Sequence, residues 1–81
     1  MRLSELSRRQ PAIVEDVEAH APNDVIARRL CELGFVPGER VEVVAAGPFG
    51  AEPLLVQVGF TRFALRQAEA ARVRLRPLVL A

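Results

Sequence analysis

The spacing of apolar residues in this chain follows a helical period in one segment and a period of two in most others. Ile26, Leu30 and Leu33 are separated by four and three residues, so they share one face of a helix. From Val41 onward the period changes, because Val41 and Val43 alternate with charged residues as in a half-buried strand. The pattern predicts a helix of about ten residues that is followed closely by a strand.

The residues at both ends of the predicted helix are typical of helix boundaries. Asn23 is the expected N-cap, and Asp24 places a negative charge in the first turn, where the helix dipole favours it. Gly34 stands where a helix end favours a residue with positive φ. We expect Phe35 and Val36 to pack beneath the helix end, before a turn at 37–38, where proline and glycine follow each other.

The remaining segments favour short strands and single helical turns. Residues 3–6 predict one helical turn, and 67–70 predict another. A bulge is expected near Glu15-Asp16 in the first strand. The glycine- and proline-rich segment 45–53 is expected to be a loop that cannot continue a strand. Five strands are predicted in all, at 12–19, 41–44, 54–58, 63–66 and 72–76.

This order of elements defines a fold class. Strand breaks that recur at intervals of about eight to twelve residues favour a small β-barrel, since a parallel α/β sheet needs more helices. The sequence predicts a mainly β, partly open five-stranded barrel, with one helix between the first two strands and a one-turn helix before the last. It is expected to form a single domain over residues 1–81.

Composition narrows the classes of function. Hydrophobic residues make up 51% of the chain and aromatic residues 5%, so aliphatic side chains must fill the core. The net charge of +1 is too small for bulk attraction to phosphates. One cysteine excludes an internal disulfide, and neither a signal-peptide core nor a bilayer-spanning run is present. We therefore expect a cytoplasmic protein.

Candidate chemistry is sparse. His20 and Cys31 are the single histidine and cysteine, and a helical cysteine is usually a small core residue. No Cys-x-x-Cys or His-x-x-x-His spacing is present, which leaves His20 and Cys31 as weak metal-ligand candidates. A surface site of Glu15, Asp16 and Glu18 beside His20 is less expected than a solvated strand face. We expect no enzyme activity, no cofactor and no metal site of the chain's own.

Five arginines lie in the last third of the chain, with one acidic residue among them: Arg62, Arg66, Arg72, Arg74 and Arg76. If the last strands pair, these side chains form a basic face that suits RNA, lipid phosphates or an acidic protein. Arginines on an edge strand also protect against aggregation. Both interpretations stay open at this point.

Nearly the whole chain resembles ferrous iron transport protein A, the FeoA family, in the order and spacing of several motifs. The motifs are Leu3-x-x-Leu6, Ala12-x-Val14-x-x-Val17, Arg29-Leu-Cys-Glu-Leu-Gly-Phe-Val-Pro-Gly38 with Val41-x-Val43, Phe49-Gly-Ala-Glu-Pro53, Val56-x-Val58-Gly59, and Phe63-Ala-Leu-Arg66 followed by Glu69-Ala70. The resemblance implies a cytoplasmic, non-enzymatic SH3-like barrel that supports bacterial ferrous iron uptake. Its implied partner is the membrane GTPase-permease FeoB. Similar domains also end iron-dependent transcription regulators, so a detached regulator domain is one alternative, and a small nucleic-acid-binding barrel is another.

The chain has apolar residues that suit docking on such a partner. We expect Phe35, Phe49, Phe60 and the tail at 78–80 to supply an apolar patch. A more specific hypothesis has Arg62 or Arg66 entering the GTPase site as an arginine finger.

Overall fold

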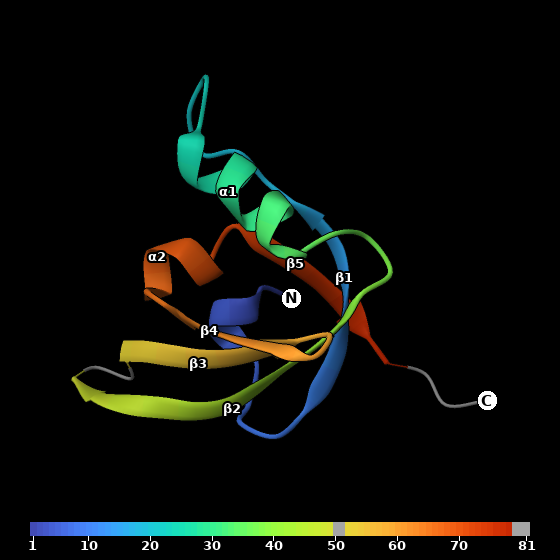
Figure 1. The fold of residues 1–81 in the computed structure, drawn as a ribbon, viewed down its shortest axis with the longest axis vertical. Coiled ribbons are helices and arrows are strands. Elements are labelled where there is room, and N and C mark those ends of the chain that lie inside the picture. The colour runs from blue at the N-terminus through green and yellow to red at the C-terminus, as the bar shows by residue number, and fades with distance from the viewer. Residues whose placement is uncertain (50–51, 79–81) are drawn as a thin grey trace.

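Five antiparallel strands form one curved sheet in the computed structural model, which describes residues 1–49 and 52–78, with Phe49 described by its backbone alone (Figure 1). The strands are β1 (Pro11–Val17), β2 (Arg40–Phe49), β3 (Glu52–Val58), β4 (Thr61–Leu65) and β5 (Val73–Pro77). Their order is β4-β3-β2-β1-β5, so β4 and β5 are the edges and the barrel is not fully closed. The helical elements are η1 (Leu3–Glu5), α1 (Val25–Leu33) and α2 (Gln67–Ala70). The predicted fold class and both single helical turns are confirmed.

The start of α1 differs from the prediction, because Asp24 is its N-cap. Asp24 Oδ1 accepts hydrogen bonds from the backbone N–H groups of Ile26 at 3.1 Å and Ala27 at 3.2 Å. Asn23 lies one residue before the cap, with a left-handed φ of 60°. The prediction of Asn23 was wrong because both residue types suit an N-cap, and only Asp24 has the extended backbone that aims its carboxylate at the first turn.

The end of α1 follows the sequence pattern. Gly34 has a φ of 117°, and its N–H donates to the Cys31 carbonyl oxygen at 3.1 Å. Phe35 is completely buried, as expected, whereas Val36 is exposed and that part of the prediction was wrong. Val36 is the first residue of the turn closed by the Glu39 N–H bond to its carbonyl, so the chain already turns outward there.

Strand β2 extends further than the sequence predicts. Ala45 to Phe49 and Glu52 to Pro53 belong to β2 and β3, so the expected loop at 45–53 was wrong for these residues, while 50–51 lie outside the described residues. The β2–β3 register shifts between Val43 and Ala45 and again between Ala46 and Phe49. These irregularities accommodate Gly47-Pro48 within the strand. Proline has no backbone N–H to donate, and at a shifted register that position does not need to donate a hydrogen bond to the neighbouring strand.

Strand β1 carries the predicted bulge, because its register against β5 shifts between Val14 and Asp16. The same strand anchors the corner after α1. The Gly38 N–H donates to the Val14 carbonyl at 2.9 Å, and the Val14 N–H donates to the Glu39 carbonyl at 2.8 Å. The corner is therefore bonded to the sheet as well as shaped by its own turn.

The core lies between the concave side of the sheet and the helical elements. The Phe35 ring lies 6.1 Å from the Phe63 ring, centroid to centroid, at an angle of 50°. Leu3 of η1 and Leu6, which is its C-cap, are both buried. The largest fully buried side chains are Phe35, Leu3, Leu30, Val14, Val41, Val43, Val56 and Val73.

Candidate functional site

The hairpin between β3 and β4 presents an aromatic side chain to solvent. Gly59 and Phe60 form the two-residue turn between Val58 and Thr61. Gly59 has a φ of 59°, whereas the φ of Phe60 is not positive, which is the pattern of a type II′ hairpin turn. Phe60 has a relative exposure of 106%. A tight turn therefore holds an unburied aromatic ring at the hairpin tip.

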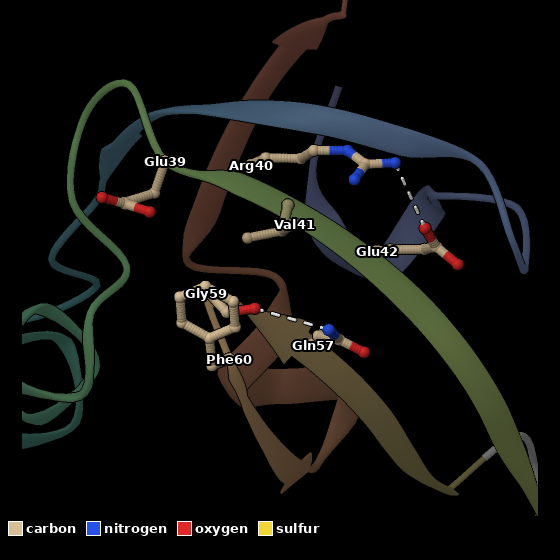
Figure 2. Close-up of a pocket in the computed structure, with 7 residues that line it drawn as sticks. All are labelled: Glu39, Arg40, Val41, Glu42, Gln57, Gly59 and Phe60. Atoms are coloured by element: carbon tan, nitrogen blue, oxygen red, sulfur yellow. Dashed lines mark hydrogen bonds and ion pairs between the residues drawn. The ribbon is translucent and has the colours of Figure 1, made fainter.

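A shallow hollow of about 240 Å³ lies beside this tip, and its lining is drawn in Figure 2. Gln57 connects the turn to the following strand. Its Nε2 donates to the Gly59 carbonyl at 3.4 Å, and its Oε1 accepts from Arg62 Nε at 3.2 Å. The lining residues are Glu39, Arg40, Val41, Glu42, Gln57, Gly59 and Phe60.

The rim of the hollow carries both signs of charge. Glu42 lies 3.6 Å from Arg40 Nη2 through one oxygen and 3.6 Å from Arg9 Nη1 through the other. Among the residues that the structure describes, the lining contains no serine, threonine, cysteine or histidine that could serve as a nucleophile or imidazole base. An exposed aromatic ring beside paired charges suits contact with another macromolecule.

The other docking candidates occupy different environments. Phe35 is fully buried, so its ring packs in the core and the expectation that it supplies a surface patch was wrong. It is buried because it follows Gly34 at the corner, where the backbone turns beneath α1. Arg62 and Arg66 are exposed. The side chain of Phe49 lies outside the described residues, as do residues 79 and 80 of the predicted apolar tail.

Cys31 is exposed, so the expectation of a core cysteine was wrong. Ala27 and Leu30 are the buried positions of α1, and Cys31 lies about 100° around the helix from Leu30, which turns it away from the core. His20 is also exposed, with its Nε2 3.5 Å from Glu18 Oε1. In residues 1–49 and 52–78, no three His, Cys, Asp or Glu side chains are grouped so that they could hold a metal ion.

Arginines pair with two of the three acidic residues near His20, Asp16 and Glu18. Arg74 Nε donates to Asp16 Oδ1 at 2.6 Å, and this hydrogen bond holds the pKa of the Asp16 carboxyl below its ordinary value. Glu18 Oε1 accepts from Arg2 Nη2 at 3.1 Å. The two carboxylates are therefore engaged in ion pairs, which makes them weak candidates for a surface metal site.

The arginine row divides into two groups in the structure. Arg72 bonds to Asp24 and Arg74 bonds to Asp16, so these two side chains belong to ion pairs. Arg62, Arg66 and Arg76 are exposed. The continuous basic face considered from the sequence is thus interrupted by carboxylates. The Asp24–Arg72 pair was missed at the sequence level, because only the folded chain brings these residues together.

The sheet order and the open seam between the edge strands β4 and β5 define a small SH3-like β-barrel domain. The family model described as the FeoA domain matches residues 1–77. The chain therefore belongs to the FeoA family, which is linked to ferrous iron transport.

Two solved structures illustrate the similarity. FeoA of Stenotrophomonas maltophilia, described as complexed with zinc and as an SH3 domain protein, is 63% identical, with a TM-score of 0.88 over 94% of this chain and 89% of that chain. The FeoA protein from Chlorobium tepidum is 32% identical, with a TM-score of 0.81 over 98% of this chain and 71% of that chain. Both carry the same fold over nearly the whole of this chain.

A curated relative joins two functions in one polypeptide. It is the Fe(2+) transport protein A/Fe(2+) transporter FeoB fusion protein of Porphyromonas gingivalis, which is 33% identical over 73 residues. The match covers 90% of this chain but only 8% of that relative's length. Among the described residues, no helix has the length and apolar character needed to cross a bilayer.

Proposed function

We propose that this domain is a cytoplasmic, non-enzymatic accessory of ferrous iron uptake that docks on the membrane transporter FeoB and modulates it. The observation that carries the proposal is the fusion relative, in which a FeoA part and a FeoB transporter form one chain. Covalent linkage gives two modules a high effective concentration for each other. A fusion therefore supports a working association between the same two modules when they are separate chains.

The hairpin tip supports a role in docking. Phe60 exposes its whole ring, and burying an aromatic ring of this kind is a large source of interface free energy. Arg62 lies two residues away, aligned by Gln57, and Arg66 follows at the end of β4. We assign Phe60, Arg62 and Arg66 to the contact with FeoB.

A more specific version of the proposal concerns GTP hydrolysis by FeoB. An exposed arginine can enter a GTPase site in trans and stabilise charge in the transition state, with an effect on the order of 10³–10⁵ in rate. Arg62 and Arg66 are exposed and make no ion pair within the described residues. Either is available for this role, although docking alone does not require it.

The test uses full-length FeoB in lipid nanodiscs and the purified chain. Binding is measured by biolayer interferometry with wild type, Phe60→Ala and the control Val25→Ala, which truncates another exposed apolar side chain. We expect Phe60→Ala to weaken binding by about tenfold or more and Val25→Ala to leave it unchanged. Absence of wild-type binding, with GDP or with a GTP analogue, contradicts docking.

GTP hydrolysis is measured in the same preparation with wild type, Arg62→Lys and Arg66→Lys. Lysine keeps the charge but lacks the planar guanidinium that a finger requires. A selective loss of stimulated hydrolysis, with binding retained, supports the finger. Equal hydrolysis with and without the domain contradicts it and leaves docking to be judged by the binding measurement.

A further inference from the structure

Within residues 1–49 and 52–78, strand β4 has one hydrogen-bonding edge with no strand beside it. A two-residue hairpin turn makes Val58 and Thr61 a hydrogen-bonded pair, and such pairs alternate along an antiparallel ladder. Phe63 therefore bonds to Val56, while the N–H and C=O groups of Arg62 and Ala64 point away from β3. In the described residues, β4 has no neighbouring strand on that side, and no backbone bond outside the sheet ladders involves Arg62 or Ala64.

An apolar groove follows this free edge. α1 lies on the side of β4 away from β3 (Figure 1). Residues of α1 and β4, with Glu69 of α2, line a hollow of about 260 Å³. Leu33 and Phe63 pack on the core but stay only partly buried, and Ile26 is 37% exposed. The lining residues are Ile26, Arg29, Leu30, Leu33, Phe63, Ala64, Leu65 and Glu69.

We propose that this groove binds an extended segment of the cytoplasmic part of FeoB, which adds to β4 as an additional antiparallel or parallel strand. This inference rests on the proposed function, and it specifies the binding mode and the chemistry of the segment. Strand addition satisfies the outward backbone groups of Arg62 and Ala64, which supplies affinity. Side chains at alternate positions of the segment enter the groove against α1, which supplies specificity.

The charges around the groove define the segment further. Arg29, Arg62 and Arg66 make no ion pair within the described residues. The acidic lining residue Glu69 already accepts the Arg66 N–H at 2.8 Å. The segment therefore carries apolar side chains at alternate positions and acidic side chains near the arginines. Protection against edge-to-edge aggregation accounts for the arginines, but it does not account for the apolar lining.

The first experiment is hydrogen exchange of the full chain, free and bound to full-length FeoB in nanodiscs, quenched and read by NMR. We expect the Arg62 and Ala64 amides to exchange rapidly in the free chain and to slow by about tenfold or more in the complex. The Phe63 amide, which already bonds to β3, serves as the internal control. Binding without added protection at Arg62 and Ala64 overturns strand addition.

Variants of the chain test the backbone pairing with β4 and the apolar contact in the groove separately, each through the affinity for FeoB. Ala64→Pro removes one outward N–H at an edge position, where proline is tolerated, whereas Ala64→Val keeps that N–H. Ile26→Glu places a carboxylate in the groove, and Val25→Glu makes the same change on the neighbouring residue outside it. We expect Ala64→Pro and Ile26→Glu to weaken binding by about tenfold, Ala64→Val to weaken it less than Ala64→Pro, and Val25→Glu to bind within about twofold of wild type.

The outcomes separate this inference from the proposed function. No wild-type binding to FeoB overturns docking itself. Wild-type binding that Ala64→Pro and Ile26→Glu both leave intact overturns the groove and keeps docking. Protection of Arg62 and Ala64 that appears without FeoB and rises with chain concentration assigns the edge to a second copy of this chain, and it also overturns the inference. If Ala64→Pro does not fold, as judged by circular dichroism, the hydrogen-exchange data test the strand pairing, and the comparison of Ile26→Glu with Val25→Glu tests the groove.

Discussion

Asp24 and Arg72 are 48 residues apart in the sequence, and Arg72 Nε donates to Asp24 Oδ2 at 2.8 Å. The pair is largely shielded from solvent, with side-chain exposures of 5% for Asp24 and 13% for Arg72. The same aspartate caps α1 and accepts the His20 N–H at 2.8 Å, and the arginine also donates to the Ala68 carbonyl of α2 at 2.7 Å. One ion pair thus joins the start of α1 to the end of α2.

Removal of the Asp24 carboxylate is expected to destabilise the chain more than the loss of an exposed ion pair. Asp24→Ala loses the N-cap and leaves Arg72 unpaired, and we expect the Tm to fall by roughly 5 °C or more. Asp24→Asn keeps the capping oxygen but loses the charge, so its Tm is expected to lie in between. Thermal unfolding followed by circular dichroism measures both, with Asp16→Asn as the exposed control. A Tm for Asp24→Ala equal to that of the control contradicts this role.

Acid is expected to destabilise the chain through the same residue. The hydrogen bond from Arg72, with that from the His20 N–H, holds the pKa of Asp24 well below its ordinary value of 3.8. Because the folded pKa is the lower one, this contribution is present above the unfolded pKa and is lost as the pH falls toward the folded pKa. Urea unfolding is therefore expected to show wild type losing more stability than Asp24→Asn between about pH 4 and pH 2. Parallel pH profiles for the two proteins contradict the assignment.

The elements that could be predicted from the sequence are those fixed by local chemistry. Helix α1 follows from the spacing of Ile26, Leu30 and Leu33, and its end follows from Gly34. The β3–β4 hairpin follows from a short glycine-containing break between two extended segments, although β4 begins at Thr61, two residues before the predicted strand at 63–66. In each case, residues close in sequence carry the whole signal.

The elements that could not be predicted depend on distant partners. Strand β2 continues past Gly47-Pro48 because β3 pairs with it across a shifted register. The exposure of Cys31 depends on which elements cover α1, and the free edge of β4 depends on the strand order of the whole sheet. Phe60 and Arg62 could be selected from the sequence as docking candidates, whereas the burial of Phe35 and the groove beside Ala64 required the fold.

Gly34 is expected to be sensitive to substitution because of its backbone conformation. Its φ of 117° is a conformation that residues with a Cβ rarely adopt, whereas space is not limiting, since an added Cβ would lie 4.0 Å from the nearest Val58 carbons. Gly34→Ala should therefore lower the free energy of unfolding by about 1–2 kcal/mol through strain alone. Gly34→Asn should cost less, since asparagine tolerates positive φ better. Urea titrations compare the two variants, and a smaller loss for alanine than for asparagine contradicts the assignment to strain.

Phe35 and Phe60, two of the three phenylalanines considered for docking, are expected to respond oppositely to truncation. Phe35→Ala removes a fully buried ring that lies 6.1 Å from Phe63, and such a cavity costs about 3–5 kcal/mol of unfolding free energy. Phe60→Ala removes a ring that contacts solvent on all sides, so its unfolding free energy should stay within about 0.5 kcal/mol of wild type. Urea unfolding of both variants at one pH measures the difference. If Phe60→Ala is destabilised as strongly as Phe35→Ala, the hairpin ring belongs to the core and its loss cannot serve as a clean test of docking. If Phe35→Ala is as stable as wild type, packing of the Phe35 ring in the core does not contribute to stability as the structure indicates.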